Sequence, residues 1–237
     1  MRINVHAGHN PAGKVACGAV GLINESTENR RVKEEVISQL RELGHTVYDC
    51  TCDNGTGQTD VLQKIVAKCN AHDVDLDVSI HFNSGAGDQA GNDKTTGVEA
   101  YVYSASSVAK PYAEKICQAV ADQGFRNRGV KYSTTLYVLK HTKAPAVLVE
   151  CCFVDDRDDV ELYDCQKMAA AIVYGITGQS VQESQETAPA DPGEETPVGD
   201  PKELYRVQVG AYGVKGNADA MKARLQAAGF DAVIVKA

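Results

Sequence analysis

Four residues of this sequence have side chains suited to activating a water molecule at a metal ion: His9, Glu25, His81 and Glu150. Two histidines and a carboxylate commonly hold a zinc ion that keeps one coordination position open for water. Glu150 ends the apolar run Val147–Val149, which is typical of a buried strand, and a carboxylate there is costly unless it has a partner or a chemical task. Together the four residues predict a metal-activated water with a general base beside it.

Each residue also has a plainer interpretation. A loop histidine such as His9 is more often a surface residue than a ligand, whereas His81 ends an apolar strand, where an aliphatic side chain is expected for packing alone. Three other glutamates compete with Glu25: Glu28, Glu34 and Glu35. Three basic residues are candidate partners for a structural ion pair with Glu150: Arg126, Arg128 and Lys131. The set of four is therefore more informative than any one member.

Alternating strand-like and helix-like patterns run through residues 1–178 and position these side chains. We predict strands at residues 2–6, 45–50, 76–82, 97–103, 136–139 and 146–149, and helices at 25–43, 60–69, 108–121 and 158–176. This alternation predicts an α/β fold with a mostly parallel, twisted sheet and helices on both faces. His9, His81 and Glu150 lie at or just after strand ends, where ligands gather in such sheets. Glu25 would join them from the first helical turn, and Gly8 should let the backbone turn sharply before His9.

Composition excludes several functions. The net charge of −8 argues against nucleic acid or anionic lipid as a partner. No apolar run is long enough to cross a membrane, and the first ten residues leave no room for a signal peptide, so we expect synthesis in the cytoplasm without an export signal. The eight cysteines include no C-x-x-C pair, which favours reduced thiols.

The chain changes character after residue 178. Between Gln179 and Pro201 the sequence contains four of the seven prolines, six acidic residues and no lysine or arginine, which is typical of a solvated linker. Residues 203–237 then follow a strand, helix, strand pattern that predicts one small β-α-β unit. The predicted organisation is a catalytic domain at 1–178, a linker at 179–202 and a small C-terminal unit at 203–237.

Several segments, taken together, resemble the zinc-dependent N-acetylmuramoyl-L-alanine amidases of the amidase-3 family. The matching segments are Gly8–His9, Gly18–Gly21, Asn24–Glu25 with Asn29, Ser79–Asn83, Gly97–Glu99, and Pro145–Glu150 with Phe153. The resemblance implies zinc ligands at His9, Glu25 and His81 and a catalytic glutamate at Glu150, with the Asn29 spacing selecting Glu25. The family usually has Asp-Pro before Gly-His, whereas this chain has His6-Ala7, so the support of the metal-binding histidine must differ here.

Two further resemblances concern the setting. The loop without Asp-Pro is similar to that of phage and prophage endolysins, which implies release to the cell wall through a separate hole-forming, holin-type protein. The segment Tyr205–Tyr212, with Leu225 and Ala228–Phe230, resembles the first half of a SPOR peptidoglycan-binding domain. Because only one half is present, we hypothesise that two tails pair in a homodimer or that the half-domain binds the wall alone.

The function expected from the resemblance is hydrolysis of the amide between N-acetylmuramic acid and L-alanine of peptidoglycan. Glu150 would take a proton from zinc-activated water. Three alternatives stay open: a zinc peptidase that cuts within the stem peptide or cross-bridge, a non-catalytic wall-binding protein, and a cysteine hydrolase that uses Cys151 or Cys152 with His141.

Overall fold

The computed structural model describes residues 1–181, 222 and 233–234. The chain divides into two units, Met1–Pro189 and Ala190–Ala237, and the account below concerns the first. The predicted C-terminal β-α-β unit, its pairing into a dimer and nearly all of the linker lie outside the described residues.

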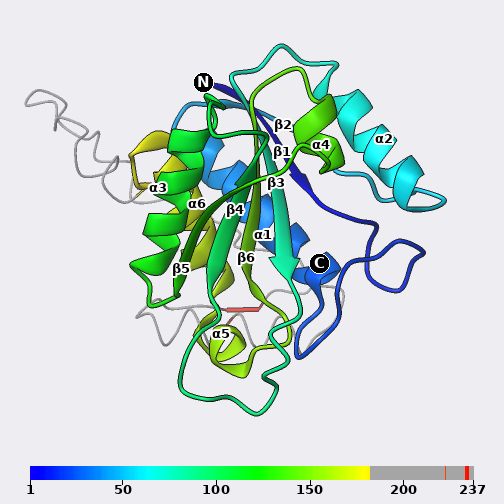
Figure 1. The fold of residues 1–237 in the computed structure, drawn as a ribbon. Helices are drawn as coiled ribbons and strands as arrows, with labels where there is room; N and C mark the ends of the chain where they lie inside the picture. Colours follow the sequence, from blue (N-terminus) through cyan, green and yellow to red (C-terminus); the bar gives the residue numbers. More distant parts are fainter. Residues whose placement is uncertain (182–221, 223–232, 235–237) are drawn as a thin grey trace, which may run out of the picture. The chain divides into compact units, whose positions relative to one another are not determined.

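A six-stranded sheet forms the centre of the first unit (Figure 1). Its strands are β1 (Arg2–Ala7), β2 (Thr46–Asp49), β3 (Leu76–Asn83), β4 (Val98–Val102), β5 (Asn127–Tyr132) and β6 (Ala146–Phe153). They lie in the order β2-β1-β3-β6-β4-β5, and every neighbouring pair is parallel except β4 with β6. The predicted class, a mostly parallel sheet with helices on both faces, is confirmed.

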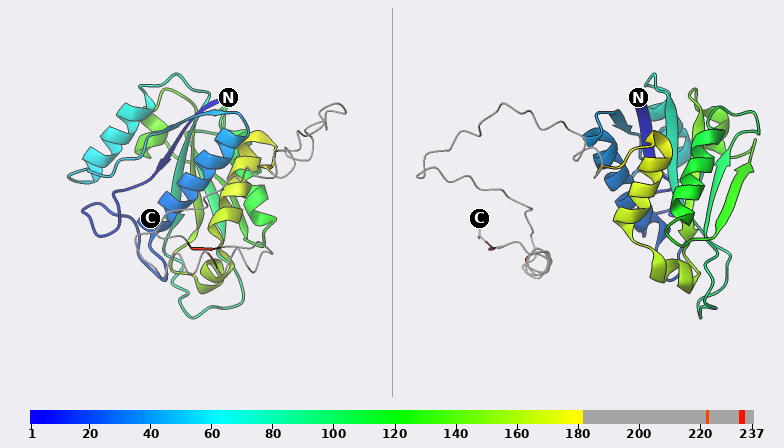
Figure 2. Two further views of the ribbon diagram at one scale, coloured as in Figure 1. Left: turned by 180° about the vertical axis from the view of Figure 1, so that it is seen from behind. Right: turned by 90° about the vertical axis from the view of Figure 1, so that its left-hand side faces the viewer.

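Three helices cover one face of this sheet: α1 (Glu25–Glu42), α3 (Lys110–Ala121) and α6 (Cys165–Thr177). Figure 2 shows α1 and α6 side by side in front of the strands when the molecule is seen from behind. Helix α1 begins where the side chain of Asn24 accepts a hydrogen bond from the backbone N–H of Thr27, and it ends before Gly44, whose φ of 81° suits glycine. The cap at Asn24 therefore fixes Glu25 as the first residue of the helix.

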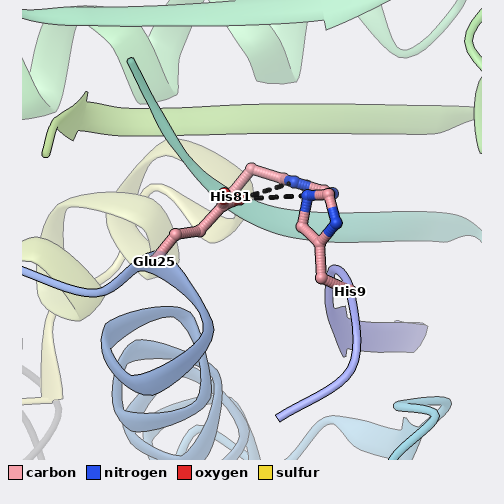
Figure 3. Close-up of side chains that lie close together, drawn as sticks. All are labelled: His9, Glu25 and His81. Atoms are coloured by element: carbon pink, nitrogen blue, oxygen red, sulfur yellow. Dashed lines mark hydrogen bonds and ion pairs between the residues drawn. The ribbon is translucent and has the colours of Figure 1, made fainter. Parts of the chain in front are cut away.

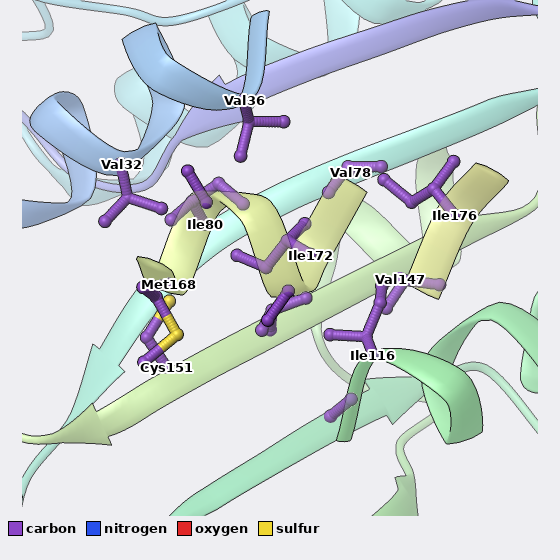
Figure 4. Close-up of a cluster of buried hydrophobic side chains, with 14 of the residues drawn as sticks. Val32, Val36, Val78, Ile80, Ile116, Val147, Cys151, Met168, Ile172 and Ile176 are labelled. Atoms are coloured by element: carbon purple, nitrogen blue, oxygen red, sulfur yellow. The ribbon is translucent and has the colours of Figure 1, made fainter. Parts of the chain in front are cut away.

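The opposite face carries α2 (Gln58–Cys69) and α4 (Tyr137–His141), which pack against each other, with α4 also on β6. The short helix α5 (Arg157–Leu162) lies beyond the end of β6. Side chains of each strand alternate between the two faces. Val78, Ile80 and Val147 therefore point into the core beneath α1 and α6 (Figure 4), whereas His81 and Glu150 point to the α2 and α4 side.

Two predicted elements are wrong and one strand was not predicted. Residues 136–139 begin the helix α4 rather than a strand, because a four-residue apolar run carries no periodicity that separates the two. The predicted helix 158–176 is two helices, since Asp164 has extended backbone and caps α6 by accepting from the N–H of Lys167. The edge strand β5 has no fully buried residue, which explains its missing hydrophobic signal.

Within the described part of the chain, no helix combines the length and apolar character that a membrane span requires.

Candidate metal centre

His9, Glu25 and His81 lie together at the carboxyl ends of β1 and β3 (Figure 3). One possible ligand atom from each residue lies within 4.8 Å of those of the other two. Glu25 Oε1 is 2.9 Å from His81 Nδ1 and 3.4 Å from His9 Nε2, and the two rings meet edge to face. Among the described residues, this is the only group of three or more such side chains with metal-binding spacing. It contains three of the four residues that the sequence singled out.

Both carboxylate oxygens of Glu25 accept hydrogen bonds from the backbone. The backbone N–H of Ala19 donates to Oε2 at 2.8 Å, and the N–H of Phe82 donates to Oε1 at 3.2 Å. Burial alone would raise the pKa of Glu25, but hydrogen bonds from His81 and His9 outweigh it and hold the pKa well below its usual range. Glu25 is therefore an anion placed between two imidazoles, as a metal ligand requires.

Glu28, Glu34 and Glu35 do not take this place. Glu28 pairs with Arg31 and accepts from the hydroxyl of Tyr163, and Glu34 is bound to Lys33. The sequence left the choice among these glutamates to a family spacing, and the cap at Asn24 now supplies a physical reason for Glu25.

The turn that carries His9 differs from the predicted one. The left-handed residue is His9 itself, with a φ of 61°, whereas Gly8 has no positive φ. Gly8 is needed because a Cβ atom there would lie 2.0 Å from Cε1 of the His81 ring. Glycine at this position therefore lets the second histidine approach the backbone of the first.

Two neighbouring residues of α1 hold this turn in place. The side-chain amide of Asn29 donates to the carbonyl of Gly8 at 3.0 Å. The guanidinium of Arg30 donates to the carbonyl of His9 at 2.9 Å, to that of Gly8 at 3.4 Å and to Asp53 at 2.7 Å. No motif in the sequence singles out Arg30, because its role depends on carbonyl groups that only the folded turn brings within reach.

Glu150 lies beside this group and has no charged partner among the described residues. It is paired in register with His81 on β3 and lines the same pocket as His9 and His81. Its Oε2 atom is buried and lacks a hydrogen bond to any described residue. Burial, and then the nearby Glu25 and Glu99 carboxylates, raise the pKa of Glu150 to about 8. The carboxyl group is therefore available to a ligand in the pocket.

One of the candidate basic partners of Glu150, Arg128, pairs with a different glutamate. Arg128 Nε donates to Oε2 of Glu99 at 2.7 Å, and Glu99 also accepts from Asn83 and from the hydroxyl of Tyr101. Glu99 stands opposite Glu150 in the antiparallel β4–β6 pair. The ion pair that was one alternative for Glu150 is thus formed by Glu99, and Glu150 forms no ion pair with a described residue.

His6, in the place of the family aspartate, is almost completely buried and lines the same pocket. Its Nδ1 lies 3.5 Å from the hydroxyl of Ser79, its register partner on β3. Burial lowers the pKa of His6 to about 3, so the ring is neutral near pH 7. His6 therefore adds an uncharged polar group to the floor of the pocket.

The cysteine alternative has no matching geometry. Cys151 and Cys152 are fully buried, and burial raises the pKa of both thiols well above the usual value. Cys151 packs beside Met168 in the core beneath α6 (Figure 4). His141 lies on α4, on the opposite face, with its ring against Tyr137. Inert core thiols explain both cysteines.

The loop at residues 84–97 is fastened to the start of α5 by carboxylates. Asp155 accepts from the backbone N–H groups of Gly85 and Gly87, each at 2.9 Å, and from that of Ala86. Asp159 accepts from the N–H of Gly97 at 3.0 Å. These contacts hold the segment that joins His81 on β3 to Glu99 on β4.

The fold and the site define an α/β protein with a three-residue candidate metal centre and an unpaired carboxyl group beside it. The family model of N-acetylmuramoyl-L-alanine amidases matches residues 3–178, and that of the SPOR domain matches residues 201–237. This chain belongs to the N-acetylmuramoyl-L-alanine amidase family, as the sequence resemblance predicted.

Relatives and solved structures agree with this membership. The chain is 37% identical over 164 residues to a protein of Clostridium perfringens, covering 69% of this chain and 47% of that protein. It is 30% identical to the N-acetylmuramoyl-L-alanine amidase CwlM of Bacillus licheniformis, covering 75% and 63%. The catalytic domain of the CD27L endolysin targeting Clostridia Difficile superposes with a TM-score of 0.67 at 26% identity, covering 76% of this chain and 98% of that one. The chain spans about half the length of the curated relatives that it matches.

Proposed function

We propose that the protein is a zinc-dependent peptidoglycan amidase, which hydrolyses the amide between the lactyl group of N-acetylmuramic acid and L-alanine of the stem peptide. Family membership supports the reaction class. One observation carries the assignment of the site: a buried, unpaired carboxyl oxygen of Glu150 lines the same pocket as a His-Glu-His group with metal-binding spacing.

The residues fit a zinc ion. His9 and His81 would each supply one imidazole nitrogen, and Glu25 would supply one carboxylate oxygen, which is a common protein ligand set for catalytic zinc. The anionic state of Glu25 and the backbone contacts from Ala19 and Phe82 support this role, because outer contacts orient a ligand and tune its basicity. When bound, zinc supplies Lewis acidity at the attacking water and at the scissile carbonyl.

The chain's own residues carry the proton. Glu150 accepts a proton from the attacking water and delivers it to the leaving nitrogen of L-alanine as the C–N bond breaks. Because its Oε2 atom has no partner among the described residues, this oxygen does not have to give up a protein hydrogen bond to act. The pair of Glu99 and Arg128 beside it limits the negative charge that faces the base.

The test is release of soluble peptide from purified peptidoglycan, with and without a chelator, followed by zinc add-back. Chelator-sensitive, zinc-restored release of peptides that begin with L-alanine is expected. New amino termini within the stem peptide or cross-bridge would instead identify a zinc peptidase, and wall binding without release would identify a binding protein. Release that ignores the chelator would remove the metal from the reaction.

Glu150→Gln tests the proton carrier. We expect this variant to bind zinc like the parent and to lose about 10²- to 10⁴-fold in turnover, the usual contribution of a general base. Glu114→Gln, an exposed position on α3, is the matched control. Substantial residual turnover in Glu150→Gln would remove Glu150 from this role, and His81→Ala should lose both zinc and activity.

We propose the same three-part organisation for the whole chain: a catalytic domain at 1–178, an acidic linker at 179–202 and a SPOR-like segment at 203–237 that binds peptidoglycan. The SPOR match at residues 201–237 supports this division. Pairing of two such segments in a homodimer stays a hypothesis. A monomer by light scattering at micromolar concentration, with a folded tail, would refute it.

A further inference from the structure

An apolar pocket opens directly beside the candidate metal centre. Its volume is about 400 Å³, and His9, His81 and Glu150 form part of its lining. This size lies within the range of small-ligand sites in proteins. Because His9, His81 and Glu150 line this pocket, a substrate group that occupies it would lie next to the bond that is cut.

The walls of the pocket come from the two helices on this face of the sheet. Most of the apolar or aromatic lining comes from Val61, Leu62 and Ile65 of α2 and from Leu136, Tyr137 and Val138 at α4. Gln58 and Thr135 add uncharged polar groups, and none of the described lining residues is a lysine, arginine or aspartate. Apart from the groups of the site itself, the pocket is uncharged.

The two sides of the scissile amide differ in charge. On one side the carbonyl belongs to a lactyl ether of an N-acetylated sugar, which is neutral and presents methyl groups and ring C–H bonds. On the other side the peptide carries ionisable carboxyl groups. A carboxylate placed among the uncharged walls would lose hydration without gaining a partner. The pocket therefore matches the sugar side and disfavours the peptide side.

A lysine side chain lies on β5, on the other side of the site from the pocket. Lys131 on β5 is exposed, and its charge acts on the Glu99 carboxylate without a direct ion pair between the two side chains. It is the register partner of Tyr101 on β4, whose hydroxyl reaches Glu99, so it faces the same side of the sheet as the site. A peptide carboxylate leaving the site toward β5 would meet this ammonium group.

We propose that the pocket between α2 and α4 binds the N-acetylmuramoyl side of the substrate, and that the stem peptide leaves the site toward β5. This assignment rests on the proposed amidase function. It makes the protein selective for a sugar-bearing amide over the same amide without the sugar.

The test compares two substrates with the same scissile bond. N-acetylmuramoyl-L-alanyl-D-isoglutamine carries the sugar, whereas D-lactoyl-L-alanyl-D-isoglutamine keeps the lactyl carbonyl and the peptide without it. For the zinc-loaded full chain, we expect kcat/KM to be about tenfold or more higher for the sugar-bearing substrate, as expected when one pocket is filled or left empty. Equal values for the two substrates would overturn the proposal.

Leu62→Trp narrows the pocket from a half-buried position, and Gln63→Trp adds the same ring at the exposed neighbouring position, which does not line the pocket. Leu62→Trp should lose most of the preference for the sugar-bearing substrate, whereas Gln63→Trp should behave like the parent. An equal loss on both substrates in Leu62→Trp would refute the assignment.

Binding of the methyl glycoside of N-acetylmuramic acid to the metal-free chain gives a readout independent of turnover. Saturation-transfer NMR should detect binding to the parent and to Gln63→Trp and a marked loss in Leu62→Trp. Sugar binding that is unchanged in Leu62→Trp would place the sugar elsewhere. If neither peptide is cleaved while the sugar still binds in a Leu62-dependent way, the amidase function fails and the sugar pocket stands.

Discussion

Arg30 offers a sharp test of how the first ligand is held. His9 has a φ of 61°, and a non-glycine residue in this region costs on the order of 1–3 kcal/mol and persists only where its surroundings enforce it. The guanidinium of Arg30 bridges the carbonyls of Gly8 and His9 to Asp53, so it supplies much of that enforcement. In Arg30→Ala the turn can relax, and the strain must be restored each time zinc binds.

The expected result follows from that cost. A free-energy difference of about 1–3 kcal/mol corresponds to roughly a 5- to 150-fold weaker zinc affinity, in line with other changes next to metal ligands. Competition with a chromophoric chelator measures the dissociation constant. The control is Arg31→Ala, which removes the arginine that is bound to Glu28 and makes no hydrogen bond to the turn.

A zinc affinity of Arg30→Ala within twofold of the parent, together with a lower melting temperature, would refute this reasoning. It would mean that Arg30 supports the fold and that the His9 turn keeps its shape without it.

Three other predictions concern the same region. In Gly8→Ala, the new Cβ atom would lie 2.0 Å from Cε1 of His81, so it should displace the ring and abolish tight zinc binding. Gly57 has extended backbone and open space around it, so Gly57→Ala should bind zinc normally in the same titration. Because burial lowers the pKa of His6 to about 3, the unfolded chain takes up a proton first as the pH falls below 6.5. The free energy of unfolding of the metal-free protein, measured by urea denaturation, should then fall by about 2 kcal/mol by about pH 5. A free energy of unfolding that does not change with pH, or that falls equally in His6→Gln, would contradict this. Asp155→Ala removes the amide contacts that fasten the 84–97 loop, so limited proteolysis should cut that loop faster than in the parent.

The residues that could be predicted from the sequence are those whose neighbours along the chain constrain them. His81 and Glu150 end apolar strands, and two such strand ends meet at one edge of a parallel sheet. Glu25 opens the predicted helix, although its choice over the other glutamates came from the family spacing and not from the cap at Asn24. These signals are local, and the fold class followed from them.

The missed features depend on contacts between distant segments. Arg30 matters because a turn 21 or more residues away presents its carbonyls to it. The partner of Arg128 could not be chosen between Glu99 and Glu150 until the direction of β4 was known. Helix α4 forms where an apolar run short enough for either structure packs against α2 and β6.

The direction of β4 has an electrostatic consequence. In a fully parallel sheet, the start of a strand lies at the edge opposite the one where ligands gather. Because β4 runs against β6, Glu99 near its start comes to stand beside Glu150 near the end of β6. One reversed strand thus pairs two acidic residues in register, and a single arginine forms an ion pair with only one of them. Burial and Glu25 raise the pKa of Glu150 most, and the reversed strand adds Glu99 to them, so the topology contributes to the tendency of Glu150 to hold the proton that it must later return.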